Sequence, residues 1–211
     1  MIDVQTPHGL ARVRLENEQD SERDGLALVL GHGAGGGVSS TDLRATTEAA
    51  VALGLTVALV EQPYRVAGRR SPPAARQLDT AWLSVLDALA AGRLAGRRLI
   101  VGGRSSGARV ACRTAELAGA TGVICLAFPL LPPGAARQGD PSKSRLTELE
   151  AVPSAIPVLI VQGERDPFGM PPEGENRSVV RIPGTHTLGS GTAVRSAVSP
   201  WLAVLAGALH G

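Results

Sequence analysis

The stretch Gly103-Arg104-Ser105-Ser106-Gly107 decides the fold that we expect for this chain. An apolar run, residues 98–102, precedes it, and residues 106–118 after it read as a helix. A strand, a G-x-S-x-G turn and a helix in that order form a strained elbow that exposes the serine hydroxyl. The residues two before and two after this serine approach each other, so both must be small. Both are glycine around Ser105, whereas Ser106 has Arg104 and Ala108 at those positions.

Six short apolar runs predict the strands of one sheet. They are continuous rather than alternating, as is typical of strands buried on both faces. Stretches with helical character lie between them, and this alternation predicts a mainly parallel central sheet with helices on both faces, in a single domain over residues 1–211. The expected strands are residues 26–30, 55–60, 99–101, 122–127, 158–161 and 178–182, and the expected helices are residues 42–53, 75–91, 106–118, 144–151 and 192–209.

Two other segments complete this architecture. Residues 2–16 alternate imperfectly around Pro7-His8-Gly9, which predicts an N-terminal β-hairpin at the edge of the sheet. Residues 129–156 are rich in proline and are expected to hold at most one short helix. This insert is too small to form a cap domain, so we expect little protein above the carboxyl ends of the strands, where ligands bind in such sheets.

Composition excludes several classes of function. The formal net charge of +2 is too small to imply a nucleic-acid partner, and aromatic residues are few. The first residues lack the basic and apolar regions of a signal peptide, and no apolar run reaches the roughly 20 residues that span a bilayer. Cys112 and Cys125 have no metal or redox spacing and are expected to be buried thiols. We therefore expect a cytoplasmic protein without a nucleic-acid or membrane partner and without a metal or organic cofactor.

A serine nucleophile needs a base, and the base needs an acid that orients it. Downstream of Ser105 the chain has two histidines, and His186 follows the sixth apolar run, where it can reach across the strand ends. His210 is penultimate, at an end prone to fraying. Asp166 comes after the run 158–161 and is the expected acid, with Glu164 as the alternative. The order Ser105, Asp166, His186 is that of α/β-hydrolases.

A glycine-rich loop, residues 31–37, follows the first buried run. Glycines let backbone N–H groups turn toward a ligand, so the Ala34 amide, together with that of Ser106, is expected to stabilise an oxyanion. His32 is expected to pack under this loop. Gly31, Gly33 and Gly36 also match a dinucleotide-binding G-x-G-x-x-G pattern. That alternative is disfavoured because the next helix begins only after capping residues at 39–41.

Taken together, these motifs resemble the α/β-hydrolase superfamily, and in particular its small, uncapped, dienelactone-hydrolase-like branch. The resemblance runs from residue 26 to about residue 209. It is carried by residues 31–36, 63–64, 68–70, 102–111, 129–134 and 165–169. Two positions depart from the branch: dienelactone hydrolase uses cysteine where this chain has Ser105, and many relatives have aspartate where it has Thr185.

The resemblance and the residues together predict a serine hydrolase that cleaves an ester, thioester or lactone of a small substrate through an acyl-enzyme. Tyr64, Arg69 and Arg104 are expected at the rim of the site, where arginines would suit an acidic substrate or else form structural ion pairs. A catalytically silent interaction module on the same fold is an alternative, because the branch also resembles chromatin-complex subunits not known for hydrolysis. An acyl transferase or cyclase with the same triad is another. The substrate and the oligomeric state are left open.

Overall fold

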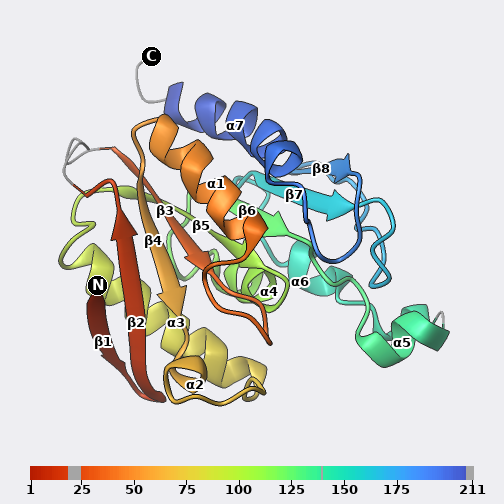
Figure 1. Ribbon diagram of the computed structural model, residues 1–211, viewed down its shortest axis with the longest axis horizontal. Helices are drawn as coiled ribbons and strands as arrows, with labels where there is room; N and C mark the ends of the chain where they lie inside the picture. The colour runs from red at the N-terminus through yellow and green to blue at the C-terminus, as the bar shows by residue number, and fades with distance from the viewer. Residues whose placement is uncertain (19–24, 139, 208–211) are drawn as a thin grey trace.

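The computed structural model describes residues 1–18, 25–138 and 140–207 (Figure 1). Within these residues the strands form one eight-stranded sheet, in the order β1-β2-β4-β3-β5-β6-β7-β8. The strands are β1 Ile2–Thr6, β2 Gly9–Glu16, β3 Leu26–Gly31, β4 Thr56–Glu61, β5 Arg98–Arg104, β6 Gly122–Leu126, β7 Val158–Gly163 and β8 Arg177–Ile182. All six strands from β3 to β8 are parallel to their neighbours among these six. The N-terminal hairpin pairs antiparallel with β4 through β2, at the edge of the sheet. The structure confirms the expected fold class.

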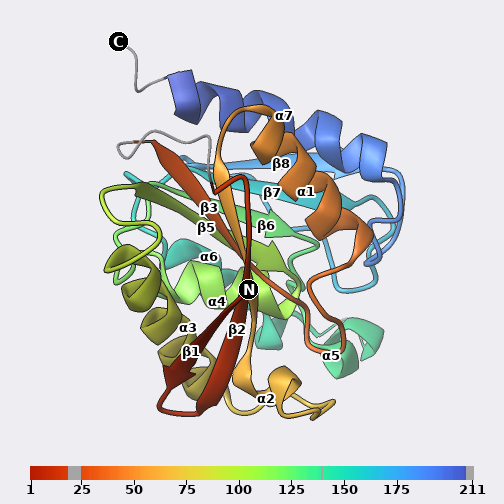
Figure 2. The ribbon, with the colours of Figure 1, turned by 60° about the vertical axis from the view of Figure 1, so that its left-hand side comes forward.

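Helices cover both faces of the sheet (Figure 2). Helices α1 (Thr41–Ala52) and α7 (Gly191–Gly207) lie together on one face, and α3 (Ala75–Ala90) and α4 (Ser106–Thr114) lie on the other. In the central strand β3, neighbouring side chains lie on opposite faces of the sheet. Val29 packs in the core under α3 and α4, whereas Leu28 and Leu30 pack under α1 and α7. Burial on both faces explains why the central strands are continuous apolar runs.

The insert between β6 and β7 is more helical than expected. It contains α5 (Pro133–Gln138), the 3₁₀ turn η1 (Pro141–Lys143) and α6 (Leu146–Glu150), rather than one short helix at most. Tertiary contacts hold these turns: Arg109 of α4 forms a two-bond ion pair with Glu148 of α6. Helix α6 is the short helix expected over residues 144–151, whereas α5 and η1 carry no apolar period, so the pattern of the sequence misses them. The same reason explains why α2 (Pro63–Val66) was not expected.

The last helix, α7, was expected to reach residue 209, and residues 208 and 209 lie outside the described part of the chain, as does His210. Its described part packs along α1 and buries Val194, Val198 and Leu202. Among the described residues, no helix is both long and apolar enough to cross a membrane.

Candidate active site

The elbow at Ser105 is strained, and the structure shows what it requires. Ser105 has φ 51° and ψ −106°, a backbone conformation that is costly for a residue with a side chain. A Cβ on Gly103 would lie 2.4 Å from the carbonyl oxygen of Gly31 and 2.9 Å from the carbonyl carbon of Gly107. A Cβ on Gly107 would also clash with Gly31. The two glycines that flank the serine therefore permit the close approach that the sequence motif predicts.

The structure brings Ser105, His186 and Asp166 together at the carboxyl ends of the strands. The Ser105 hydroxyl lies 2.9 Å from Nε2 of His186, and Nδ1 of His186 lies 2.9 Å from Oδ2 of Asp166. The side chain of Asp166 is fully buried, and that of His186 is 18% exposed. The buried carboxylate accepts the Nδ1 proton, so Nε2 is the ring nitrogen that accepts the Ser105 proton. The Phe168 ring meets the His186 ring edge-on, at 4.5 Å between centroids.

Further hydrogen bonds hold the carboxylate of Asp166 in place. Oδ1 of Asp166 accepts the backbone N–H of Phe168 at 2.9 Å, and Oδ2 accepts Nε2 of Gln162 at 2.8 Å. A Cβ on Gly163 would lie 2.3 Å from the carbonyl oxygen of Thr185, so only glycine lets the two loops meet here. Glu164, the alternative acid, is exposed and makes no side-chain contact with His186 among the described residues.

The glycine-rich loop after β3 offers the backbone donors. Among the described residues, no acceptor takes the N–H of Ala34 or that of Ser106 at the start of α4. His32 lies beneath the loop: its Nε2 accepts the N–H of Gln62 at 3.0 Å, so its Nδ1 donates to the carbonyl of Gly33 at 2.8 Å. Burial lowers the pKa of His32. This imidazole is therefore neutral and supports the loop.

Tyr64, which was expected at the rim, supports the same loop from another element. Its hydroxyl donates to the carbonyl of Ala34 at 2.8 Å, and its side chain is buried. Burial raises the pKa of Tyr64 to about 12, so the hydroxyl keeps its proton in neutral solution. Tyr64 thus fixes the position of the peptide unit that follows the Ala34 amide.

Arg104 was expected at the rim of the site, either as a substrate contact or in a structural ion pair, and the structure shows the ion pair. Its Nε donates to Oδ2 of Asp42 at 2.9 Å, and its Nη2 donates to the carbonyl of His186 at 3.2 Å. A Cβ on Gly33 would lie 2.8 Å from Nη1 of this arginine, so the guanidinium also lies against the loop. Asp42 is 2% exposed. Because the guanidinium pairs with a buried carboxylate, it is a structural support of the His186 loop.

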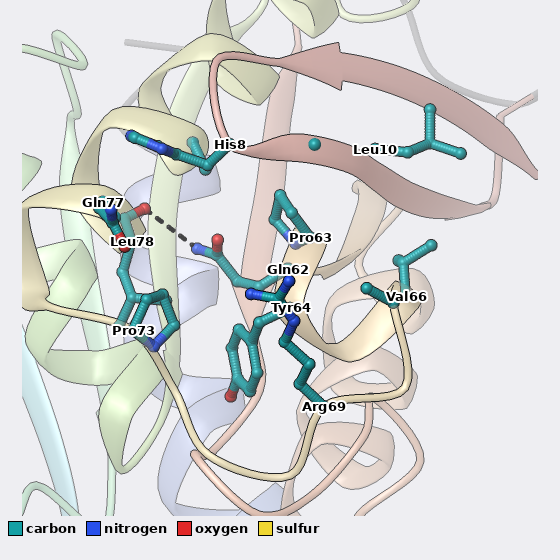
Figure 3. A pocket seen from close by; sticks show the side chains of 13 residues that line it. His8, Leu10, Gln62, Pro63, Tyr64, Val66, Arg69, Pro73, Gln77 and Leu78 are labelled. Atoms are coloured by element: carbon teal, nitrogen blue, oxygen red, sulfur yellow. Dashed lines mark hydrogen bonds between the residues drawn. The ribbon is translucent and has the colours of Figure 1, made fainter.

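Arg69 is not brought to the triad. It lines a cavity of about 400 Å³ between the β1–β2 turn, α2 and α3 (Figure 3). Tyr64 lines the same cavity, but Ser105, His186 and Asp166 do not. Of the three residues expected at the rim, Tyr64 and Arg104 therefore have structural roles beside the triad. Arg69 lines a neighbouring cavity, whose wall also includes Tyr64.

Sequence reasoning missed Asp42 and Gln162. Asp42 lies in the first turn of α1 and accepts hydrogen bonds from the N–H of Leu43, the hydroxyl of Ser40 and the guanidinium of Arg104. In the sequence, an acidic residue at that position indicates only an ordinary helix start. Gln162 has a clearer signal, because it is a polar residue at the end of the buried apolar strand β7. Buried amides need partners, and here the two Nε2 protons are shared among three acceptors: Oδ2 of Asp166 and the carbonyl oxygens of Phe128 and Gly169.

The cysteines lie away from these residues. Cys112 on α4 and Cys125 on β6 are buried, with their Sγ atoms 3.4 Å apart. The hydrogen bond between Cys125 and Cys112, together with burial, raises the pKa of Cys125, which makes a thiolate unfavourable there. In the part of the chain that the structure describes, no group of three or more histidine, cysteine or acidic side chains could hold a metal ion.

Comparisons with known proteins define the class. A family model described as an alpha/beta hydrolase domain matches residues 24–191, and the chain therefore belongs to the alpha/beta hydrolase family. The match covers the elbow, the glycine-rich loop and the His186 loop. No curated protein sequence matches the chain.

Solved structures share the whole fold at low sequence identity. Est1E from Butyrivibrio proteoclasticus with ferulic acid bound is 18% identical, with a TM-score of 0.77 over 99% of this chain and 100% of that one. XC6422 from Xanthomonas campestris, an α/β serine hydrolase without a lid, is 19% identical, with a TM-score of 0.71 over 97% and 94%. Dienelactone hydrolase from Anabaena variabilis ATCC 29413 is 17% identical, with a TM-score of 0.68 over 96% and 95%. These likenesses show that the chain shares the fold of these proteins.

Proposed function

We propose that this protein is a serine hydrolase that cleaves an ester-type bond of a small substrate. The observation that carries the proposal is the continuous hydrogen-bonded line from Ser105 through His186 to Asp166, which starts at a strained elbow. Membership of the alpha/beta hydrolase family supports it, and so does the fold shared with esterases and other hydrolases.

In the proposed reaction, Ser105 Oγ attacks the carbonyl carbon while its proton moves to Nε2 of His186. Asp166 stabilises the imidazolium that forms. The negative charge on the carbonyl oxygen is stabilised by the N–H groups of Ala34 and Ser106. His186 then returns the proton to the leaving alcohol or thiol, and an acyl-enzyme remains on Ser105. Water, deprotonated by His186, attacks the acyl group and releases the acid.

Short acyl groups, compact esters and lactones are the proposed substrates. Among its described residues, the segment between β6 and β7 offers a six-residue and a five-residue α-helix and one 3₁₀ turn to roof the site. A long acyl chain needs extended apolar walls, which so small an insert does not build. A series of aryl esters from acetyl to palmitoyl tests this, with methyl ferulate added because Est1E holds ferulic acid. We expect the rate to be highest at the short chains, and a maximum at palmitoyl would refute the proposed substrate class.

Labelling with a fluorophosphonate probe tests the nucleophile. The probe forms a bond between its phosphorus and an activated serine Oγ and releases fluoride. We expect the wild type and Ser106→Ala to be labelled, and Ser105→Ala to be unlabelled and to lose at least about 10³-fold in kcat. Ser106 is the matched control because it is the next residue and donates through its backbone. Absence of labelling in the wild type would favour the catalytically silent alternative.

A further inference from the structure

The cavity beside the candidate active site has the dimensions of a ligand site. Its volume of about 400 Å³ falls within the range of small-molecule pockets. Apolar side chains form much of its wall, including Leu10 of the hairpin, Val66 of α2 and Leu78 of α3 (Figure 3). No triad residue lines the cavity, and Tyr64 is the residue of its wall that also supports the glycine-rich loop.

Contacts between the elements keep this cavity formed. The hairpin turn rests on α2, since a Cβ on Gly9 would lie in ordinary contact with Pro63, 3.6 Å from its Cβ. The Gln62 amide joins the start of α2 to α3 by donating to the carbonyl of Leu78 at 3.2 Å. Three segments distant in the sequence are thus held at fixed separation around an open space, and a ligand would bind without having to order them.

The backbone of Arg69 is held in place by the end of α2. The N–H of Arg69 donates to the carbonyl of Tyr64, and the N–H of Gly68 donates to the carbonyl of Arg65, each at 2.8 Å. With φ +74° at Gly68, this pair of bonds is a Schellman motif, which fixes the direction in which the chain leaves the helix. Figure 3 shows the Arg69 side chain extending from this turn into the cavity, beside Tyr64 and Gln62.

Within the described part of the chain, the charge of Arg69 has no charged partner. Over residues 1–18, 25–138 and 140–207, no carboxylate pairs with Arg69, and no aspartate or glutamate lines the cavity. By contrast, Arg109 and Arg113 each pair with at least one carboxylate. A guanidinium at an apolar cavity is complementary to an anion that carries an apolar body.

We propose that this cavity is a second binding site, separate from the triad, for a small organic carboxylate. The carboxylate pairs with the guanidinium of Arg69, and the apolar body of the ligand packs against Leu10, Val66 and Leu78. A single cation at a walled cavity selects a small molecule, because a nucleic acid or an anionic membrane is bound by several cations spread over an open surface.

Three probes separate the contributions of charge and apolar body. Phenylacetate carries both, phenylacetamide keeps the body without the charge, and acetate keeps the charge without the body. Isothermal titration calorimetry on the full chain should show phenylacetate binding at least about tenfold more tightly than either of the others, as expected for a charge-assisted bond combined with apolar burial. Equal affinity for phenylacetate and phenylacetamide would overturn the role of Arg69.

Matched variants locate the site. Arg69→Ala should weaken phenylacetate binding about tenfold, whereas Arg70→Ala should leave it unchanged, because Arg70 is an exposed neighbour that does not line the cavity. Gln77→Trp, at an exposed lining position, should fill the cavity and abolish binding. Equal losses in the Arg69 and Arg70 variants would show general surface attraction and reject the site.

The separation from the triad has its own test, which does not depend on the proposed hydrolase activity. Ser105→Ala should bind phenylacetate as the wild type does. If the protein hydrolyses aryl acetates, phenylacetate should not compete with them. Competitive inhibition that Gln77→Trp abolishes would mean that the cavity is part of the substrate site, and the proposal of a second site would be wrong.

Discussion

Arg104 is the last residue of β5 and Arg69 follows α2, and both were expected at the rim of the site, yet their surroundings differ. Arg104 is 19% exposed, pairs with the buried Asp42 and holds the His186 carbonyl. Arg69 is exposed, lines a cavity and meets no described carboxylate. The difference teaches that the role of an arginine follows from what the fold places opposite its guanidinium. The guanidinium of Arg104 is paired and supports the triad, whereas the guanidinium of Arg69 is available to a ligand.

Between these regions lies the loop of residues 31–37. Arg104 lies against Gly33, and Tyr64, which also lines the cavity, donates to Ala34. If the triad and the Arg104 side chain that supports it perform catalysis, substitutions at these residues should reduce kcat strongly. Substitutions on the cavity side of the loop should have smaller effects on the reaction.

The largest effect on kcat is expected at Asp166, the acid of the triad. Asp166→Asn removes the charge that stabilises the His186 imidazolium and permits the wrong tautomer, so kcat for an aryl acetate should fall by about 10³- to 10⁴-fold. Glu164→Gln, two residues away and exposed, is the matched control and should retain wild-type kcat. A similar loss in both variants would leave the acid unassigned.

A smaller effect is expected at Arg104, which contacts the site only through other residues. Arg104→Ala should lower kcat about ten- to hundredfold by displacing the His186 loop, and should destabilise the fold by on the order of 3 kcal/mol, because Asp42 becomes an unpaired buried charge.

The double variant Asp42→Asn with Arg104→Met separates these two effects. It removes the unpaired charge, so the free energy of unfolding in urea should recover, while kcat should stay low because the His186 carbonyl has no donor. Recovery of kcat together with stability would show that Arg104 does not position the base.

At the boundary with the cavity, Tyr64→Phe removes one hydrogen bond to the Ala34 carbonyl. Loss of a neutral hydrogen bond corresponds to about 1 kcal/mol, so kcat should fall roughly threefold to tenfold, with KM nearly constant if the loop acts on the transition state. Steady-state kinetics over a range of substrate concentrations separates the two constants. A rise in KM alone would instead indicate that Tyr64 contacts the substrate.

The smallest effect concerns the ionisation of Tyr64, the only tyrosine of the chain. Ultraviolet difference absorbance should show its phenol titrating at a pKa of about 12 in the folded protein and near 10 in the unfolded chain. The folded form holds the proton more tightly, so this contribution to stability is present below pH 10 and is lost as the pH rises toward 12. Wild type should therefore lose more stability than Tyr64→Phe over that range, and equal losses would place the phenol in water.

Much of the fold follows from local pattern. Continuous apolar runs are typical of strands buried on both faces, and the predicted runs coincide with β3 to β8 within a few residues. The predicted helix 144–151 is present as α6 (Leu146–Glu150). The short helices α2 and α5 were missed because helices of four and six residues are held by neighbours rather than by an apolar period. The predicted helix 106–118 ends earlier, at Thr114, and continues as turns.

By itself, the sequence determined the fold class and the elbow, because a tight turn at Ser105 tolerates only glycine at positions 103 and 107, and it narrowed the base and acid to a few residues after later strands. Only the tertiary structure decided which of them meet. It placed Asp166 rather than Glu164 against His186, paired Arg104 with Asp42 and left Arg69 facing a cavity. The physical reason is that a charged side chain is assigned by the groups within a few ångströms of it, and those groups come from strands and loops far apart along the chain.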